Sequence, residues 1–106
     1  MVHAITSSNF DQEVMQSTKP VILDIAASWC GPCQMMKPIF HQVAEELKDT
    51  YTFGQVDIDE SRDLAIKFGI TSVPSFIFIK DGVIVGKERG YMSQVDLKAK
   101  IEQIFA

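Results

Sequence analysis

Hydrophobic positions recur with two different spacings along the chain, and the spacing changes at a few clear places. Residues 21–26 form a nearly continuous apolar run, Val-Ile-Leu-Asp-Ile-Ala, which is typical of a buried parallel strand. From Cys33 onward, apolar residues return every three or four positions as far as Leu47, as on one face of a helix. Residues 53–58 predict a second strand, so strand, helix and strand form a βαβ unit.

Three further helices are predicted outside this unit, over residues 8–15, 62–68 and 93–105. The last begins near Ser93, with Asp96 three residues later in a weak capping pattern. Pro38 lies inside the long helix and is expected to kink it, because its ring clashes with the preceding turn.

A hairpin is predicted near the C-terminal end. Apolar runs at residues 76–79 and 83–85 flank Lys80-Asp81-Gly82. Asp-Gly between two such runs predicts a tight turn in which both turn residues have positive φ. The elements together predict an α/β protein with a mixed sheet, partly parallel, covered by helices on both faces.

Composition limits the classes of function. The chain has 106 residues, 46% of them apolar and 23% charged, and no linker or repeat divides it, so we expect a single domain over residues 1–106. Its ten Lys and Arg are scattered and the net charge is −4, which argues against nucleic-acid binding. The N-terminus lacks the pattern of a secretory signal, and no apolar run is long enough to span a bilayer. We therefore expect a cytoplasmic protein without a membrane partner.

The two cysteines, Cys30 and Cys33, are separated by two residues at the start of the predicted long helix. A cysteine at a helix N-terminus has its thiolate stabilised by unpaired N–H groups and by the helix dipole. The thiolate is the species that attacks a disulfide, and a second cysteine held close by resolves the mixed disulfide quickly. Asp24 is the only charge in the first strand; burial would raise its pKa and make it a proton acceptor for Cys33.

Two other interpretations of the cysteine pair stay open at this point. A zinc site usually needs four ligands, and only His3 and His41 remain as soft ligands, neither at ligand spacing from the pair, so no metal is expected. An inert structural disulfide would close so short a loop that its entropic benefit would be small.

The residues Trp29-Cys30-Gly31-Pro32-Cys33 resemble the active-site motif of the thioredoxin family at every position. Val73-Pro74 is similar to the family's cis-proline loop, Gly90 to the glycine of its substrate groove, and Asp24 to its buried aspartate. The resemblance extends from Phe10 to the C-terminal helix. It implies the thioredoxin fold, with a central, mostly five-stranded mixed sheet and helices on both faces.

The resemblance also implies a function, the reduction of disulfides in cytosolic proteins. Cys30 would be the nucleophile, Cys33 the resolving thiol and Asp24 the proton carrier, with no cofactor. Electrons would come from a flavin-containing thioredoxin reductase that uses NADPH, and the protein would act as a monomer.

The resemblance further implies roles for the neighbours of the cysteines. Gly31 and Pro32 accompany reductants rather than oxidants. An apolar surface around the exposed sulfur of Cys30 would bind extended substrate segments, and with the groove glycine it would comprise Trp29, Val73, Pro74, Gly90 and Tyr91.

Three positions depart from the commonest family pattern. Ala26 stands where a second tryptophan is usual, Gln34 replaces a basic residue after the second cysteine, and Gln55 replaces a lysine near the aspartate. Loss of that lysine should raise the pKa of Asp24 further, although Gln55 can still donate a hydrogen bond. A module that only binds partners, and an oxidant or isomerase on the same fold, are the alternative functions.

Overall fold

The computed structural model describes residues 1–106, and its centre is one mixed sheet of five strands in the order β1-β3-β2-β4-β5. The strands are β1 (Val2–Ala4), β2 (Val21–Ala26), β3 (Thr52–Asp57), β4 (Ser75–Lys80) and β5 (Val83–Arg89). Both β1 and β2 run parallel to β3, whereas β4 is antiparallel to β2 and to β5. The mixed five-stranded sheet is thus confirmed, with β2 buried at every residue in its centre.

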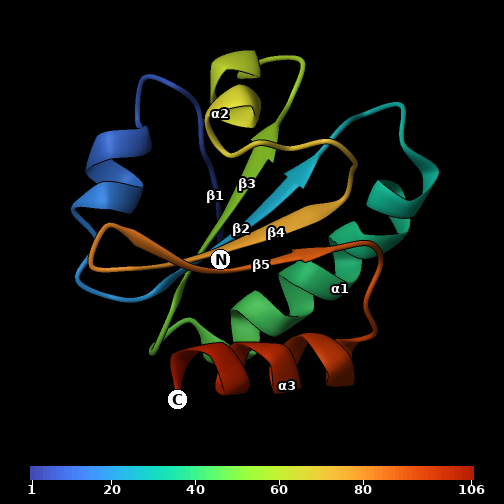
Figure 1. The fold of residues 1–106 in the computed structure, drawn as a ribbon. Coiled ribbons are helices and arrows are strands. Elements are labelled where there is room, and N and C mark those ends of the chain that lie inside the picture. Colours follow the sequence, from blue (N-terminus) through green and yellow to red (C-terminus); the bar gives the residue numbers. More distant parts are fainter.

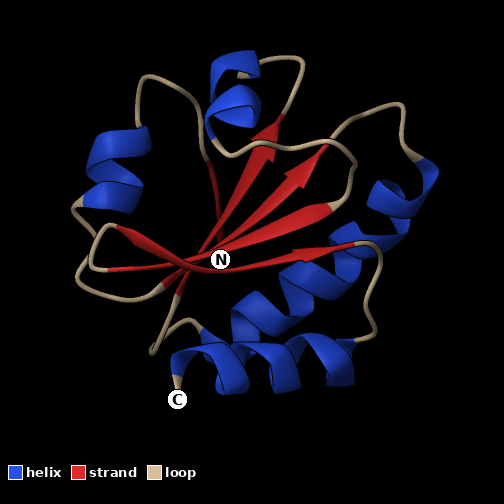
Figure 2. Ribbon diagram, viewed as in Figure 1, coloured by secondary structure: helices blue, strands red, loops and turns tan.

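Helices cover both faces of this sheet, as expected. They are η1 (Asp11–Met15), α1 (Gly31–Leu47), α2 (Arg62–Lys67) and α3 (Gln94–Phe105). Figures 1 and 2 show α1 and α3 together on one face, with η1 and α2 on the other. None of the helices combines the length and the apolar character that crossing a membrane would require.

The alternation of side chains along β2 divides the core into two halves. Val21, Leu23 and Ile25 point to one face and pack with residues of η1 and α2. Ile22 points to the other face and packs against α1 and α3. Asp24 lies two residues after Ile22, so its carboxyl group belongs to the α1 half of the core. The one charge of the central strand is thereby directed at the helix that begins beside the cysteines.

The predicted hairpin is present between β4 and β5. Lys80 pairs with Val83, and the two residues between them, Asp81 and Gly82, have φ values of 53° and 76°. Positive φ at both positions is the geometry that the Asp-Gly sequence predicts.

Two elements at the N-terminal end differ from the expectation. The hydrophobic pattern did not predict the first strand, β1. It has only three residues, too few for an alternation of apolar and polar residues to be visible in the sequence. The helix expected over residues 8–15 is the shorter η1, a π-helical turn closed by the hydrogen bond from Gln16 N–H to the Asp11 carbonyl, 3.0 Å. Short elements of this kind depend on packing rather than on local pattern.

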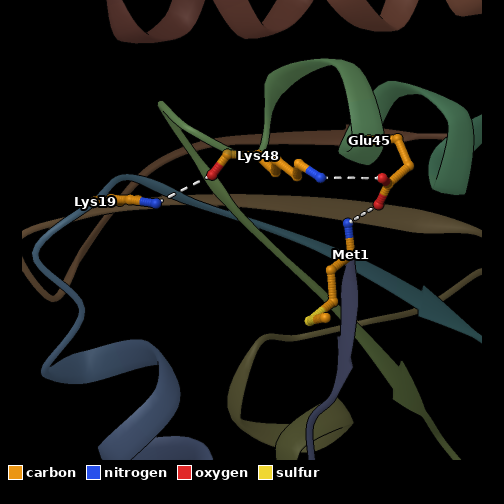
Figure 3. Close-up of polar contacts among 4 residues, drawn as sticks. All are labelled: Met1, Lys19, Glu45 and Lys48. Atoms are coloured by element: carbon orange, nitrogen blue, oxygen red, sulfur yellow. Dashed lines mark hydrogen bonds and ion pairs between the residues drawn. The ribbon is translucent and has the colours of Figure 1, made fainter.

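The start of the chain is tied to the C-terminal end of α1 (Figure 3). The Met1 ammonium lies 2.6 Å from Glu45, and Lys48 lies 3.3 Å from the same carboxylate. Lys19 donates to the Lys48 carbonyl at 3.0 Å. These groups are exposed, so they add little stability. They sit at the end of α1 that is remote from the cysteines.

Candidate active site at the start of helix α1

The cysteine pair lies where β2 ends and α1 begins. Cys30 is the N-cap residue of α1, and its sulfur accepts the backbone N–H of Cys33 at 3.2 Å. Both cysteines are free thiols. Pro32 occupies the first turn of the helix, where its missing N–H leaves no hydrogen bond unmade. The sulfur of Cys30 therefore sits among the free N–H groups of the helix start, where negative charge is favoured.

The Cys30 sulfur is less exposed than expected. Cys30 has 7% of its surface exposed and Cys33 has 3%. They form a small apolar cluster with Ala26 and Ala27, against which Ile58 and Val73 pack. Little of Cys30 is therefore open to solvent, because these apolar neighbours pack around it.

The loop before β4 contacts the cysteine pair. The Val73–Pro74 peptide bond is cis, as the resemblance implies, and the Cys30 thiol donates to the Val73 carbonyl at 3.6 Å. Gly90 N–H donates to the Pro74 carbonyl at 2.9 Å, and its φ of +93° favours glycine. The structure thus brings Cys30, Val73, Pro74 and Gly90 into one connected site.

Two large aromatic side chains are exposed beside this site. Trp29 is 68% exposed and Tyr91 is 48% exposed. The indole N–H of Trp29 donates to Asp59 at 3.0 Å, which anchors the ring from the loop after β3. Asp59 was not among the residues that the sequence indicated for the site. Nothing in its spacing pointed to Trp29, because the contact joins two loops.

Asp24 is fully buried, and its two carboxylate oxygens differ. Oδ2 accepts a hydrogen bond from the Gln55 amide at 3.1 Å, while Oδ1 has no hydrogen-bond partner in the protein. Burial raises the pKa of Asp24 to about 7, and the Gln55 hydrogen bond offsets a part of that rise. The expectation of a raised pKa is confirmed. A carboxyl group that titrates near neutral pH can both accept and return a proton.

Cys33 resists ionisation in the reduced protein. Burial raises the pKa of its thiol to about 12, with smaller contributions from the hydrogen bond with Cys30 and from the charges of Cys30 and Asp24. A thiol with such a pKa is a poor nucleophile at neutral pH unless a base removes its proton. Asp24 lies close enough for its charge to affect Cys33, so it is the nearby group with a suitable pKa.

A cavity of about 330 Å³ lies behind Cys33, away from the cis-proline loop. Its walls come from α1, β1 and β3, and its lining includes Ala26, Cys33, Gln34, Lys37, His41 and Gln55. The small side chain of Ala26 leaves this space open next to Cys33. The structure contains no cluster of three or more His, Cys, Asp or Glu residues that could hold a metal ion.

Comparison with known proteins identifies the family over nearly the whole chain. The family model described as Thioredoxin matches residues 1–103. A thioredoxin of Mycoplasmoides gallisepticum is 37% identical over 98 residues, which cover 92% of this chain and 96% of that protein. A thioredoxin of Alicyclobacillus acidocaldarius is 37% identical over 100 residues, 94% of each chain. Thioredoxin H4 of Arabidopsis thaliana is 42% identical over 86 residues, 81% of this chain and 71% of that protein.

Membership of this family shows which class of reaction the two free thiols at the start of α1 perform. Relatives that match nearly the whole chain are thioredoxins. The two cysteines lie close together at the start of α1, beside a mixed sheet that helices cover on both faces. The chain therefore belongs to the thioredoxin family and is a thiol-disulfide oxidoreductase that reduces protein disulfides.

Proposed function

We propose that Cys30 and Cys33 perform this reduction in two exchange steps. The Cys30 thiolate attacks one sulfur of a substrate disulfide; an S–S bond forms to Cys30, and the substrate's other sulfur leaves as a thiolate. Cys33 then loses its proton and attacks Cys30, which releases the second substrate thiol. The substrate gains two electrons, and the protein is left with a Cys30–Cys33 disulfide. The observation that supports these roles is the Cys33 N–H donated to the Cys30 sulfur at the helix start.

Asp24 is the proton acceptor in the second step. Its carboxylate takes the Cys33 proton as Cys33 attacks, and returns it when the disulfide is reduced again. Its full burial, its pKa of about 7 and its influence on the Cys33 thiol support this role.

Substrates bind as extended segments across the cis-proline loop. The Val73 backbone pairs with the substrate in strand fashion, and Trp29, Pro74, Gly90 and Tyr91 contact its side chains. The exposed rings of Trp29 and Tyr91, and the positive φ of Gly90, support this surface. Gly31 and Pro32 restrict the loop between the cysteines and favour the reducing direction.

The reaction cycle is completed by a flavin-containing thioredoxin reductase with NADPH, and the protein acts as a monomer in the cytoplasm. The family resemblance supports this partner. The use of the only two cysteines as a redox pair suits a compartment in which structural disulfides are rare.

The first experiment is insulin-disulfide reduction with dithiothreitol as the electron source, comparing the native chain with Cys30→Ser. We expect only the native chain to accelerate precipitation of the insulin chains. If both proteins match the uncatalysed rate, the redox roles of Cys30 and Cys33 are wrong and a pure binding module becomes the better interpretation.

The role of Asp24 is tested separately with Asp24→Asn. We expect slower resolution of a mixed disulfide between Cys30 and a small thiol at neutral pH, because Cys33 loses its proton acceptor. A resolution rate equal to that of the native chain across neutral pH would exclude the proton-transfer role.

A further inference from the structure

Gln55 is the one polar side chain that both contacts Asp24 and lines the cavity behind Cys33. On β3 it pairs in register with Asp24 on β2, and its amide donates to Oδ2 at 3.1 Å. The cavity wall includes Gln55 and Cys33 but not Asp24 itself. The side chain of Gln55 therefore stands between the buried carboxyl group and the space that leads to solvent.

This contact makes the two oxygens of Asp24 unequal. An oxygen that already accepts an amide N–H is a poor place for a proton, whereas Oδ1 has no partner in the protein. Oδ1 is therefore the more favourable of the two oxygens for a proton. The same hydrogen bond stabilises the ionised carboxylate, so it lowers the pH at which Asp24 becomes able to accept a proton, against the larger effect of burial.

We propose that Gln55 is a positioning residue for resolution of the mixed disulfide: it holds the Asp24 carboxyl group by Oδ2, keeps Oδ1 as the proton-accepting atom, and screens the carboxyl group from the cavity. This inference rests on the proposed function of Asp24. Gln55 itself exchanges no proton and touches no substrate.

Few other groups compete for control of Asp24. Cys33 on α1 interacts with it electrostatically, and its cross-strand neighbour on β4, Phe76, carries no charge. The charged or titratable groups of the cavity wall are Lys37 and His41 of α1, Asp57 of β3, and Glu60. Burial and the nearby Lys37 lower the pKa of His41, which disfavours a positive charge there. Gln55 is thus the direct partner through which the surroundings act on the carboxyl group.

The test compares Gln55→Met and Gln55→Lys. Methionine keeps the length of the side chain but cannot donate, so the pH profile of resolution should move up by about one unit. Resolution should then be roughly tenfold slower below the native midpoint and equal to native well above it. Lysine adds a positive charge beside Asp24, so the profile should move down. The Asp24 titration, followed by carboxyl ¹³C NMR, should move in the same directions.

Gln34→Met is the matched control. Gln34 has the same side chain and lines the same cavity, but its amide donates to the Ser28 carbonyl at 3.1 Å rather than to Asp24. We expect no change in the Asp24 titration. An equal shift in this variant would assign the effect to the polarity of the cavity and overturn the role of Gln55.

Two further outcomes separate this inference from the role of Asp24. If Gln55→Met slows resolution by one factor at every pH and leaves the Asp24 titration unmoved, Gln55 is merely structural and the inference fails. In an Asp24→Asn background, both Gln55 variants should lose their pH-dependent effect. If the titration shifts as expected while Asp24→Asn resolves at the native rate, the positioning is real but the proposed role of Asp24 is wrong.

Discussion

Asp24 is an ionisable group in the buried central strand, where burial makes its ionisation unfavourable. Its pKa of about 7 in the folded protein exceeds the ordinary value of 3.8. Between pH 3.8 and about pH 7, Asp24 therefore binds more protons in the folded protein than in the unfolded chain. The free energy of unfolding therefore falls as pH rises through this window, by on the order of 4 kcal/mol in total.

Replacing the carboxyl group should remove this loss. We expect Asp24→Asn to be more stable than the native chain at about pH 8, by up to about 4 kcal/mol, and to show no such gain at about pH 4. Urea unfolding at both pH values measures the difference. A gain of the same size at both would mean that desolvation of the ionised carboxylate is not its cause.

The indole N–H of Trp29 donates one hydrogen bond, to Asp59 on another loop. Because Trp29 is the only tryptophan, the intrinsic tryptophan fluorescence of the protein reports the surroundings of this one ring. We expect Asp59→Ala to increase quenching by acrylamide and to lower the anisotropy, since the indole loses its anchor. Asp63→Ala is the control, because Asp63 accepts a hydrogen bond from the Ser7 hydroxyl, whereas the Trp29 indole donates to Asp59. Equal changes in both variants would contradict the anchoring role.

At the scale of elements, helix starts are where local sequence determines structure most directly. The capping pattern at Ser93 is confirmed: its hydroxyl accepts the Asp96 N–H at 3.1 Å and α3 begins at the next residue. Cys30 plays the same part for α1 with a sulfur atom in place of an oxygen. In both cases the partners lie three residues apart, so a short sequence window contains the whole interaction.

The cap of α3 predicts a measurable stability difference. We expect Ser93→Ala to lower the free energy of unfolding by about 1 kcal/mol, because the Asp96 N–H loses its acceptor. Ser93→Asp retains an acceptor and should stay within a few tenths of the native value. Denaturant unfolding compares the three proteins, and equal losses in both variants would exclude the cap as the cause.

At the scale of the whole molecule, the α1 half of the core joins the active-site helix to the sheet. Phe40 of α1 is fully buried and meets Phe53 of β3 edge-on at 5.5 Å between ring centroids. Its ring is also 6.1 Å from that of Phe76 on β4. The cysteines are therefore held by a helix whose position depends on aromatic packing about two to three turns away from them.

Truncating Phe40 should lower the free energy of unfolding far more than truncating a surface residue. We expect Phe40→Ala to lower the free energy of unfolding by about 3–5 kcal/mol, because a large cavity opens between α1 and the sheet. Ile66→Ala, at a side chain that is 74% exposed, should stay within about 0.5 kcal/mol of native. Urea unfolding measures both, and similar losses would contradict the assigned core.

Several features follow from the sequence by itself. The βαβ unit, the Asp81-Gly82 hairpin, the Ser93 cap and the placement of the cysteines at a helix start each depend on residues close together in the chain. Local periodicity and turn geometry are therefore sufficient to predict them. The order of Asp24, the cysteine pair, Pro74 and Gly90 along the chain indicated the family, and the family indicated the class of reaction.

Only the tertiary structure decided which residues from distant parts of the chain contact one another. The hydrogen bonds from Gln55 to Asp24, from Trp29 to Asp59 and from Cys30 to Val73 join residues that are 31, 30 and 43 positions apart. Such contacts depend on strand register and on the path of loops, which no local pattern specifies. The same holds for β1, whose three residues form a strand because β3 lies beside them, and for the burial of Cys30 beneath neighbouring loops.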